Sequence, residues 1–274
     1  MWQLLNIKPF CSNETFRKLS FFGKIILIYN VSRFRIFRKT FTDVKLINGH
    51  YVFVKDLNDN SLVIDLGASN GIFSAEITKL YNNTCYAIEP NVELYKNLNQ
   101  ENIISLNYAI SNSDGPIDFY ISNNYEASSI LNDFENIWKS EKKITVQGIT
   151  FKSLLDILKI DNKKIDLLKV DIEGAELDLI ESLTNNEVKN IKQITIEFHD
   201  WLNKNLYDRT VGAITKLISL GFTGYTYGSL YQHPVEMFFL NKKLIDFNIK
   251  QKVFLRICKS VPYPILRKFS PQED

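Results

Sequence analysis

The chain contains few cysteines and no long hydrophobic run. Its three cysteines are Cys11, Cys85 and Cys258, in a sequence of 274 residues. Their odd number and wide spacing argue against a disulfide framework and against a Cys-x-x-Cys metal site, and a reducing, cytoplasmic setting is expected. The most apolar N-terminal stretch, residues 25–32, is uncharged for only eight residues, whereas a membrane span needs about 20 apolar residues.

No strong excess of charge of one sign is present, since the net charge is only +2. The two ends of the chain are basic and its middle is acidic, which argues against a nucleic-acid partner over the central part. The basic N-terminal part is interleaved with aromatic residues. Residues 16–39 are therefore either an amphipathic helix on anionic lipid, peripheral on the inner membrane face, or a helix packed on the domain with its Lys and Arg stems reaching water.

The glycine loop of residues 65–71 is the most informative motif. An apolar run, residues 62–64, leads directly into Asp65-Leu66-Gly67-Ala68-Ser69-Asn70-Gly71, and a helical pattern follows. A buried strand, a glycine turn and a helix N-terminus form the first unit of a nucleotide-type cofactor site. The Gly-x-Gly-x-x-Gly pattern of dinucleotide enzymes is missing, and an Asp in the loop repels a pyrophosphate but suits an ammonium group. The motif therefore favours S-adenosylmethionine over NAD.

The ends of the next two predicted strands complete this candidate cofactor site. Glu89 ends one strand, and Pro90 opens the following helix at a favoured position. An acid roughly 20 residues beyond the glycine loop is placed to accept hydrogen bonds from ribose hydroxyls, although it also suits a helix N-terminus. Ala109, Ile110 and Ser111, at the end of the third strand, are placed to line the adenine pocket.

Strand and helix patterns alternate along the chain and predict an α/β fold. The predicted strands are 62–66, 85–89, 103–109, 165–170 and 191–197, and the predicted helices are 72–81, 91–100, 175–183 and 208–220. Such alternation predicts a mostly parallel sheet with helices on both faces. Two short runs, 223–227 and 236–240, predict a C-terminal antiparallel pair, and Asn48-Gly49 predicts a hairpin over 44–54. Residues 111–150 form either a substrate lid or a hairpin over 117–122 with a peripheral helix.

A second group of acids follows the fourth and fifth strands. Asp171 and Glu173 lie at the end of the strand over 165–170, and alternation places Glu197 and His199 on one face at the end of the next strand. Carboxyl ends of parallel strands meet at one sheet edge, beside the ligand crevice. His199 is suited to proton transfer near neutral pH, or is a hydrogen-bonded residue at a strand end; Glu173 also suits a helix N-terminus.

Four segments together resemble the FkbM-type methyltransferases: residues 63–71 (VIDLGASNG), 88–90 (IEP), 168–176 (LKVDIEGAE) and 196–199 (IEFH). The resemblance covers roughly residues 45–245. It implies a Rossmann-like class I methyltransferase fold and S-adenosylmethionine-dependent O-methylation of a sugar, glycan or other natural-product hydroxyl. Lys152 stands where the family often has an Asp, which leaves a substrate role for that position in doubt.

The resemblance and the motifs together define the expected organisation and chemistry. The expected parts are a basic, aromatic-rich helical extension over 1–44, a methyltransferase domain over 45–245 and a basic tail over 246–274. A sugar hydroxyl is a poor nucleophile, so a base or a metal should assist. Our candidate base is His199, with Asp171, Glu173 and Glu197 around the acceptor; the carboxylates could instead hold Mg²⁺.

Three rival functions remain at this point. A nicotinamide oxidoreductase has the same kind of sheet, but this sequence lacks the glycine pattern of that class. A nucleic-acid methyltransferase is expected to carry Asn/Asp-Pro-Pro-aromatic or a Pro-Cys nucleophile, and neither occurs. The third alternative is not an enzyme: it is a catalytically silent scaffold that docks at a membrane through its basic ends.

Overall fold

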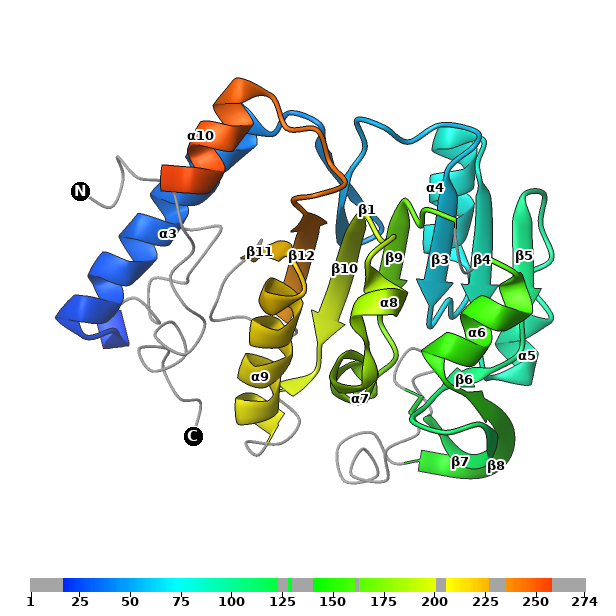
Figure 1. Ribbon diagram of the computed structural model, residues 1–274. Coiled ribbons are helices and arrows are strands. Elements are labelled where there is room, and N and C mark those ends of the chain that lie inside the picture. The colour runs from blue at the N-terminus through cyan, green and yellow to red at the C-terminus, as the bar shows by residue number, and fades with distance from the viewer. Residues whose placement is uncertain are drawn as a thin grey trace.

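Seven strands form the central sheet of the computed structural model, which describes residues 17–122, 128–129, 140–160, 163–200, 206–226 and 235–257. The strand order is β11-β12-β10-β9-β3-β4-β5 (Figure 1). The strands are β3 (Leu62–Leu66), β4 (Thr84–Ile88), β5 (Ile103–Leu106), β9 (Leu167–Val170), β10 (Gln193–Phe198), β11 (Phe222–Thr226) and β12 (Val235–Asn241). Strands β10, β9, β3, β4 and β5 run parallel, and β12 pairs antiparallel with both β10 and β11. This order confirms the predicted fold class.

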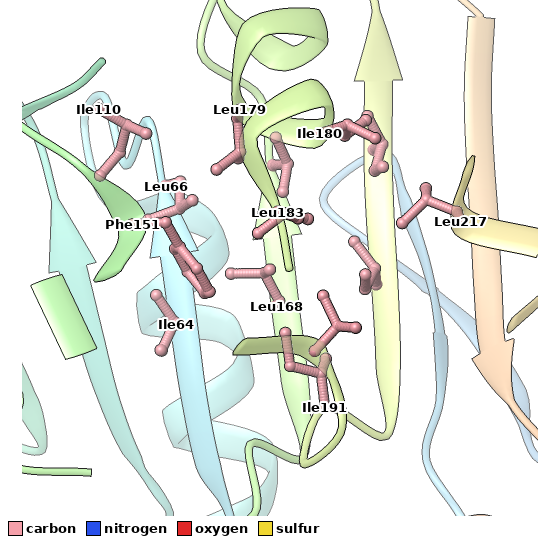
Figure 2. Close-up of a cluster of buried hydrophobic side chains, with 14 of the residues drawn as sticks. Ile64, Leu66, Ile110, Phe151, Leu168, Leu179, Ile180, Leu183, Ile191 and Leu217 are labelled. Carbon is pink, nitrogen blue, oxygen red and sulfur yellow. The ribbon is translucent and has the colours of Figure 1, made fainter. Parts of the chain in front are cut away.

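Helices cover both faces of the sheet. One face carries α6 (Phe151–Leu158), α7 (Glu176–Ser182), α8 (Asn185–Val188) and α9 (Leu206–Ser219), and the other carries α4 (Ile72–Tyr81). Alternate residues of β3 serve the two faces. Ile64 packs in the cluster that includes the α6, α7 and α9 side chains (Figure 2), whereas Val63 packs with Phe73 and Ile77 of α4. Fully buried parallel strands explain the continuous apolar runs in the sequence.

Most predicted elements are present, with two differences in the first half. The helix predicted over 91–100 is only α5 (Val92–Tyr95), because Leu98 turns inward to be fully buried beside Gly71. The strand predicted over 103–109 ends at Leu106, and β6 (Ala109–Ile110) joins a separate three-stranded sheet of order β6-β8-β7. Its other strands are β7 (Gly115–Ser122) and β8 (Ser140–Ile149). Residues 117–122 thus belong to one strand, β7, whose antiparallel partner is β8 rather than a strand within the same short segment. The substrate lid and the peripheral helix stay predictions, because residues 123–127 and 130–139 lie outside the described residues.

The N-terminal extension contains α3 (Phe21–Thr40), whose first turn is capped by the Ser20 hydroxyl accepting from the Gly23 amide. Its last turns pack on the domain, since the Phe37 ring lies 4.9 Å from Tyr225 and 5.5 Å from Phe254 of α10 (Ile249–Ile257). Figure 1 shows α3 and α10 together at one end of the molecule. A hairpin of β1 (Val44–Ile47) and β2 (His50–Phe53) then leads into the sheet. Among the described residues, no helix has the length and apolar character that a membrane crossing requires.

Candidate functional site

The glycine loop lies at the switch point of the sheet, where the chain first leaves β3 toward β4 and later returns to β9 on the other side of β3. The Gly67 and Ala68 amides both donate to the Ile88 carbonyl at 3.0 Å, which holds the loop against the end of β4. Gly67 has φ +78°, and a Cβ there would lie 1.7 Å from the Asp171 carbonyl oxygen. Only glycine therefore lets the ends of β3 and β9 approach this closely.

A cavity of about 310 Å³ opens above this edge of the sheet. Most of the predicted cofactor residues line it: Gly67, Ala68, Ser69, Asn70, Glu89, Pro90, Ala109 and Ile110. Asp171, Glu173 and Glu197 line the same cavity. The structure thus brings the two predicted groups of residues together around one space, with the loop residues on one side and the acids on the other.

Four predicted residues do not line this cavity. Asp65 is completely buried under the loop, and His199 lies behind the acids. Gly71 is the left-handed N-cap of α4, where a Cβ would lie 2.6 Å from Leu98. Ser111 is turned away, with its hydroxyl donating to the Ser113 carbonyl at 2.6 Å. These four residues therefore contribute to the structure around the cavity and do not line it themselves.

Glu89 is buried with both carboxylate oxygens held by the backbone. One oxygen accepts from the Ser69 amide and the other from the Asn91 amide, each at 2.8 Å. Burial raises the pKa of Glu89 to about 7, although the two amides oppose the rise. Each oxygen keeps a second lone pair, so this carboxylate can join the glycine loop to a ligand hydroxyl group.

Lys169 occupies the place that the sequence suggested for a ligand ammonium group. Its Nζ lies 3.1 Å from Asp65 Oδ1 and 3.4 Å from Asp171 Oδ2, and it donates to the Gly67 carbonyl at 2.7 Å. Burial lowers the pKa of Lys169, but the two carboxylates outweigh burial and raise it above its usual value. The predicted contact between Asp65 and a ligand ammonium group is therefore replaced by an internal ion pair that braces the loop.

His199 is surrounded by carboxylates that favour its charged form. Its Nδ1 lies 3.1 Å from Glu176 Oε1, and its Nε2 lies 3.3 Å from Glu173 Oε2 and 3.7 Å from Glu197 Oε1. Burial lowers the pKa of His199, but Glu176, Glu173 and Asp171 outweigh it and raise the pKa to about 10. A buried imidazolium has no free lone pair at neutral pH. The assignment of His199 as general base stays a prediction, and the carboxylates around the ring favour a role in orienting the acids.

The acids around the cavity differ in their ionisation. Burial raises the pKa of Glu173 and of Glu197 to about 8. Burial would also raise the pKa of Asp171, but Lys169 overrides it and lowers that pKa below its usual value. Glu173 has φ +51°, an uncommon conformation for a non-glycine residue, and this turn directs the chain from β9 into α7.

Sequence reasoning missed three residues of the site. His50 of β2 and Lys169 of β9 line the cavity, and Glu236 of β12 lies opposite Glu197 in the sheet register. Lys169 interrupts an apolar strand, which is itself a sequence signal, because a buried charge requires a partner. His50 and Glu236 carried no such local signal, since the fold brings them in from outside the main βα units.

The sheet order and the glycine loop at the switch point define a class I methyltransferase fold. The family profile described as "Methyltransferase FkbM domain" matches residues 65–223, more than half of the sequence. The chain belongs to the FkbM methyltransferase domain family.

Two curated relatives match part of the chain. "Hexuronic acid methyltransferase AglP" of Haloferax volcanii is 23% identical over 154 residues, covering 54% of this chain and 60% of AglP. "Methyltransferase sdnD" of Sordaria araneosa is 26% identical over 195 residues, covering 59% of this chain and 73% of sdnD. Among solved structures, precorrin-6y C5,15-methyltransferase from Geobacter metallireducens superposes with a TM-score of 0.35 at 15% identity, covering 68% of this chain and 81% of that one.

Proposed function

We propose that the protein transfers a methyl group from S-adenosylmethionine to a hydroxyl of a sugar, glycan or similar natural product. The observation that carries the cofactor assignment is Glu89, a buried carboxylate that lines the cavity while both of its oxygens are fixed by backbone amides. An acid at this position of the second strand suits the ribose hydroxyls of a nucleoside. Gly67 and Ser69 would lie under the methionine part, and Ala109 and Ile110 beside the adenine.

The acids across the cavity would position the acceptor. When bound, S-adenosylmethionine supplies the methyl group: a new O–C bond forms, the C–S bond breaks, and sulfur keeps the bonding pair as a thioether. The hydroxyl proton passes to the ionised form of Glu173, whose population grows as the pH rises toward its pKa of about 8. This carboxylate faces the cavity and is oriented from behind by His199 at 3.3 Å. Asp171 and Glu197 are less free to take it, because Asp171 is paired with Lys169 and Glu197 contacts Glu236.

The acceptor class is supported by the name of one relative. AglP is described as a hexuronic acid methyltransferase, and a polar cavity wall with three carboxylates suits a polyhydroxylated acceptor through multiple hydrogen bonds. A hydroxyl acceptor also requires a residue that removes a proton, which the acids supply. We therefore infer O-methylation of a sugar.

Calorimetric titration with S-adenosylhomocysteine tests the cofactor assignment, with NAD as the control ligand. We expect micromolar binding of S-adenosylhomocysteine, weakened at least about tenfold by Glu89→Ala because the ribose hydroxyls lose their acceptor. Glu93→Ala, an exposed acid five residues beyond the strand end, is the matched control and should bind as the unmodified chain does. Absence of binding at millimolar ligand would refute the proposal and leave the scaffold function.

Glu173→Gln tests the assignment of the base. We expect turnover with a uronic-acid-containing glycan to fall by about 10²–10⁴-fold, the usual contribution of a general base, while the affinity for S-adenosylhomocysteine is kept. Glu187→Gln, on the exposed capping box of α8, is the control for loss of one carboxylate. Unchanged turnover in Glu173→Gln would remove this residue from the proton-transfer step.

A further inference from the structure

We propose that His50, Asp171 and Glu197 form a divalent cation site in the wall of the cavity. One ligand atom from each residue can be chosen so that all three lie within 4.8 Å of one another. All three residues line the cavity. They come from β2, the end of β9 and the end of β10, so a cation held there would tie the N-terminal hairpin to the catalytic edge of the sheet.

His50 is the observation that separates this cluster from an ordinary group of acids. Its side chain is buried, with the residue only 3% exposed. Its Nδ1 lies 3.4 Å from Glu236 Oε2, yet neither atom has a hydrogen-bond partner among the described residues. Its Nε2 lies 3.8 Å from Asp171 Oδ2, beyond hydrogen-bond distance. A buried imidazole surrounded by carboxylates but bonded to none requires an explanation, and a cation between them provides one.

The carboxylates of the cluster are also incompletely satisfied. Asp171 Oδ1 is buried and has no hydrogen-bond partner among the described residues. Glu197 and Glu236 face each other across β10 and β12, with their side chains in hydrogen-bond contact. Like charges directly opposite in a sheet are destabilising, so this pair requires either a shared proton or a cation. Lys169 contacts Asp171, but it also serves Asp65 and the Gly67 carbonyl.

A second group, Asp171, Glu176 and His199, has similar spacing but is not available to a cation. Glu176 accepts from the Ile172 amide and from the Gly174 amide at 3.0 Å. Its Oε1 also lies 3.1 Å from His199 Nδ1. Because Glu176 already has these donors, a metal would have to break several hydrogen bonds there. The first cluster offers unbonded atoms instead.

The donor set indicates the kind of cation. One imidazole with two or three carboxylates suits Mn²⁺ or Zn²⁺ better than Mg²⁺, which prefers oxygen ligands and bound water. His50 and Glu236 lie outside the family match of residues 65–223, whereas Asp171 and Glu197 lie within it, so the donor set is complete only with residues from beyond that match. The role follows from the proposed function: a cation in this wall would lower the pKa of an acceptor hydroxyl bound to it.

Mn²⁺ binding to the EDTA-treated full chain tests the site without cofactor or acceptor. Free Mn²⁺ is counted by electron paramagnetic resonance during a titration, and circular dichroism verifies the fold of each variant. We expect about one bound Mn²⁺ per chain, with the affinity lowered at least about tenfold in both His50→Gln and Glu197→Gln. Glu93→Gln, an exposed acid, should keep the affinity of the unmodified chain. His199→Gln, from the second group, should lower the affinity less than His50→Gln does, because His199 only contacts Glu197 at 3.7 Å.

Several outcomes would overturn the proposal. No stoichiometric Mn²⁺ up to millimolar concentration would mean that Glu197 and Glu236 share a proton instead. Loss of binding in His199→Gln but not in His50→Gln would move the cation to the second group. If His50→Gln does not fold, Glu197→Gln decides alone. Binding of S-adenosylhomocysteine to the same metal-free chain is measured in a separate titration. Loss of Mn²⁺ binding with S-adenosylhomocysteine binding kept would refute the metal site alone, and absence of both would also refute the methyltransferase assignment.

Discussion

Replacement of Lys169 by Met should lower the free energy of unfolding more than the loss of an exposed ion pair does. The residue is 4% exposed and its partner Asp65 is 0% exposed, with Nζ 3.1 Å from Oδ1. Met has a similar volume but no charge, so Asp65 keeps only the Ser74 hydroxyl at 2.7 Å. Removing one partner of a buried ion pair costs about 3–5 kcal/mol, because the remaining charge has neither water nor a counterion.

The reverse change should cost less. Asp65→Asn leaves Lys169 beside Asp171 at 3.4 Å and the Gly67 carbonyl at 2.7 Å, and we expect a loss of about 1–3 kcal/mol, the typical cost of a weakened buried polar contact. The double variant Asp65→Asn/Lys169→Met should lose less than the sum of the two single losses, because no uncompensated charge remains at position 65.

Urea unfolding followed by circular dichroism measures these free energies. The matched control is Lys143→Met, which breaks the 2.7 Å contact with Asp118 where both side chains are more than half exposed. We expect that change to cost less than about 1 kcal/mol. If Lys169→Met were as mild as Lys143→Met, or if the two single losses at positions 65 and 169 simply added, the reasoning from a desolvated pair would be refuted.

Three further predictions test other parts of the molecule. Gly67→Ala should abolish tight S-adenosylhomocysteine binding, since its Cβ would lie 1.7 Å from a backbone oxygen. The control Gly49→Ala has the same sign of φ but free space around it, and it should lose only about 1–2 kcal/mol of stability, measured by urea unfolding. Equal effects of the two substitutions would contradict the steric argument. Affinity for S-adenosylhomocysteine should fall by up to about tenfold from pH 8 to pH 6, because Glu89, with its pKa near 7, accepts hydroxyl donors better when ionised. Calorimetry of Glu89→Gln should show a flatter pH profile, and an equally steep profile would mean that a group other than Glu89 titrates. Lipid contact through residues 16–39 remains a prediction. The double variant Phe21→Ser/Phe22→Ser, at side chains 73% and 64% exposed, should reduce co-sedimentation with anionic vesicles without loss of stability. Equal co-sedimentation of the variant and the unmodified chain would refute lipid contact.

The local elements of the fold were predictable because their signals are short-range. A buried apolar run followed by a glycine turn predicted β3 and α4 with their observed bounds. The Asn48-Gly49 turn likewise predicted the hairpin of β1 and β2. The boundaries that differed depended on packing elsewhere: α5 is short because Leu98 turns under the loop, and the third strand divides because Ala109 pairs with Gly148 of β8.

The sequence by itself determined most of the residues that gather at the candidate site, because parallel strands bring their carboxyl ends to one sheet edge. It did not indicate His50, Lys169 or Glu236. It could not determine their charge states or partners. Lys169 reaches Asp65 only because β9 lies beside β3, and the pKa of His199 is raised because Glu176, Glu173 and Asp171 lie around it. The pKa of a buried group depends on charges within a few ångströms, whatever their distance along the chain. Tertiary structure alone therefore decided which charged groups surround Glu173, His50 and His199.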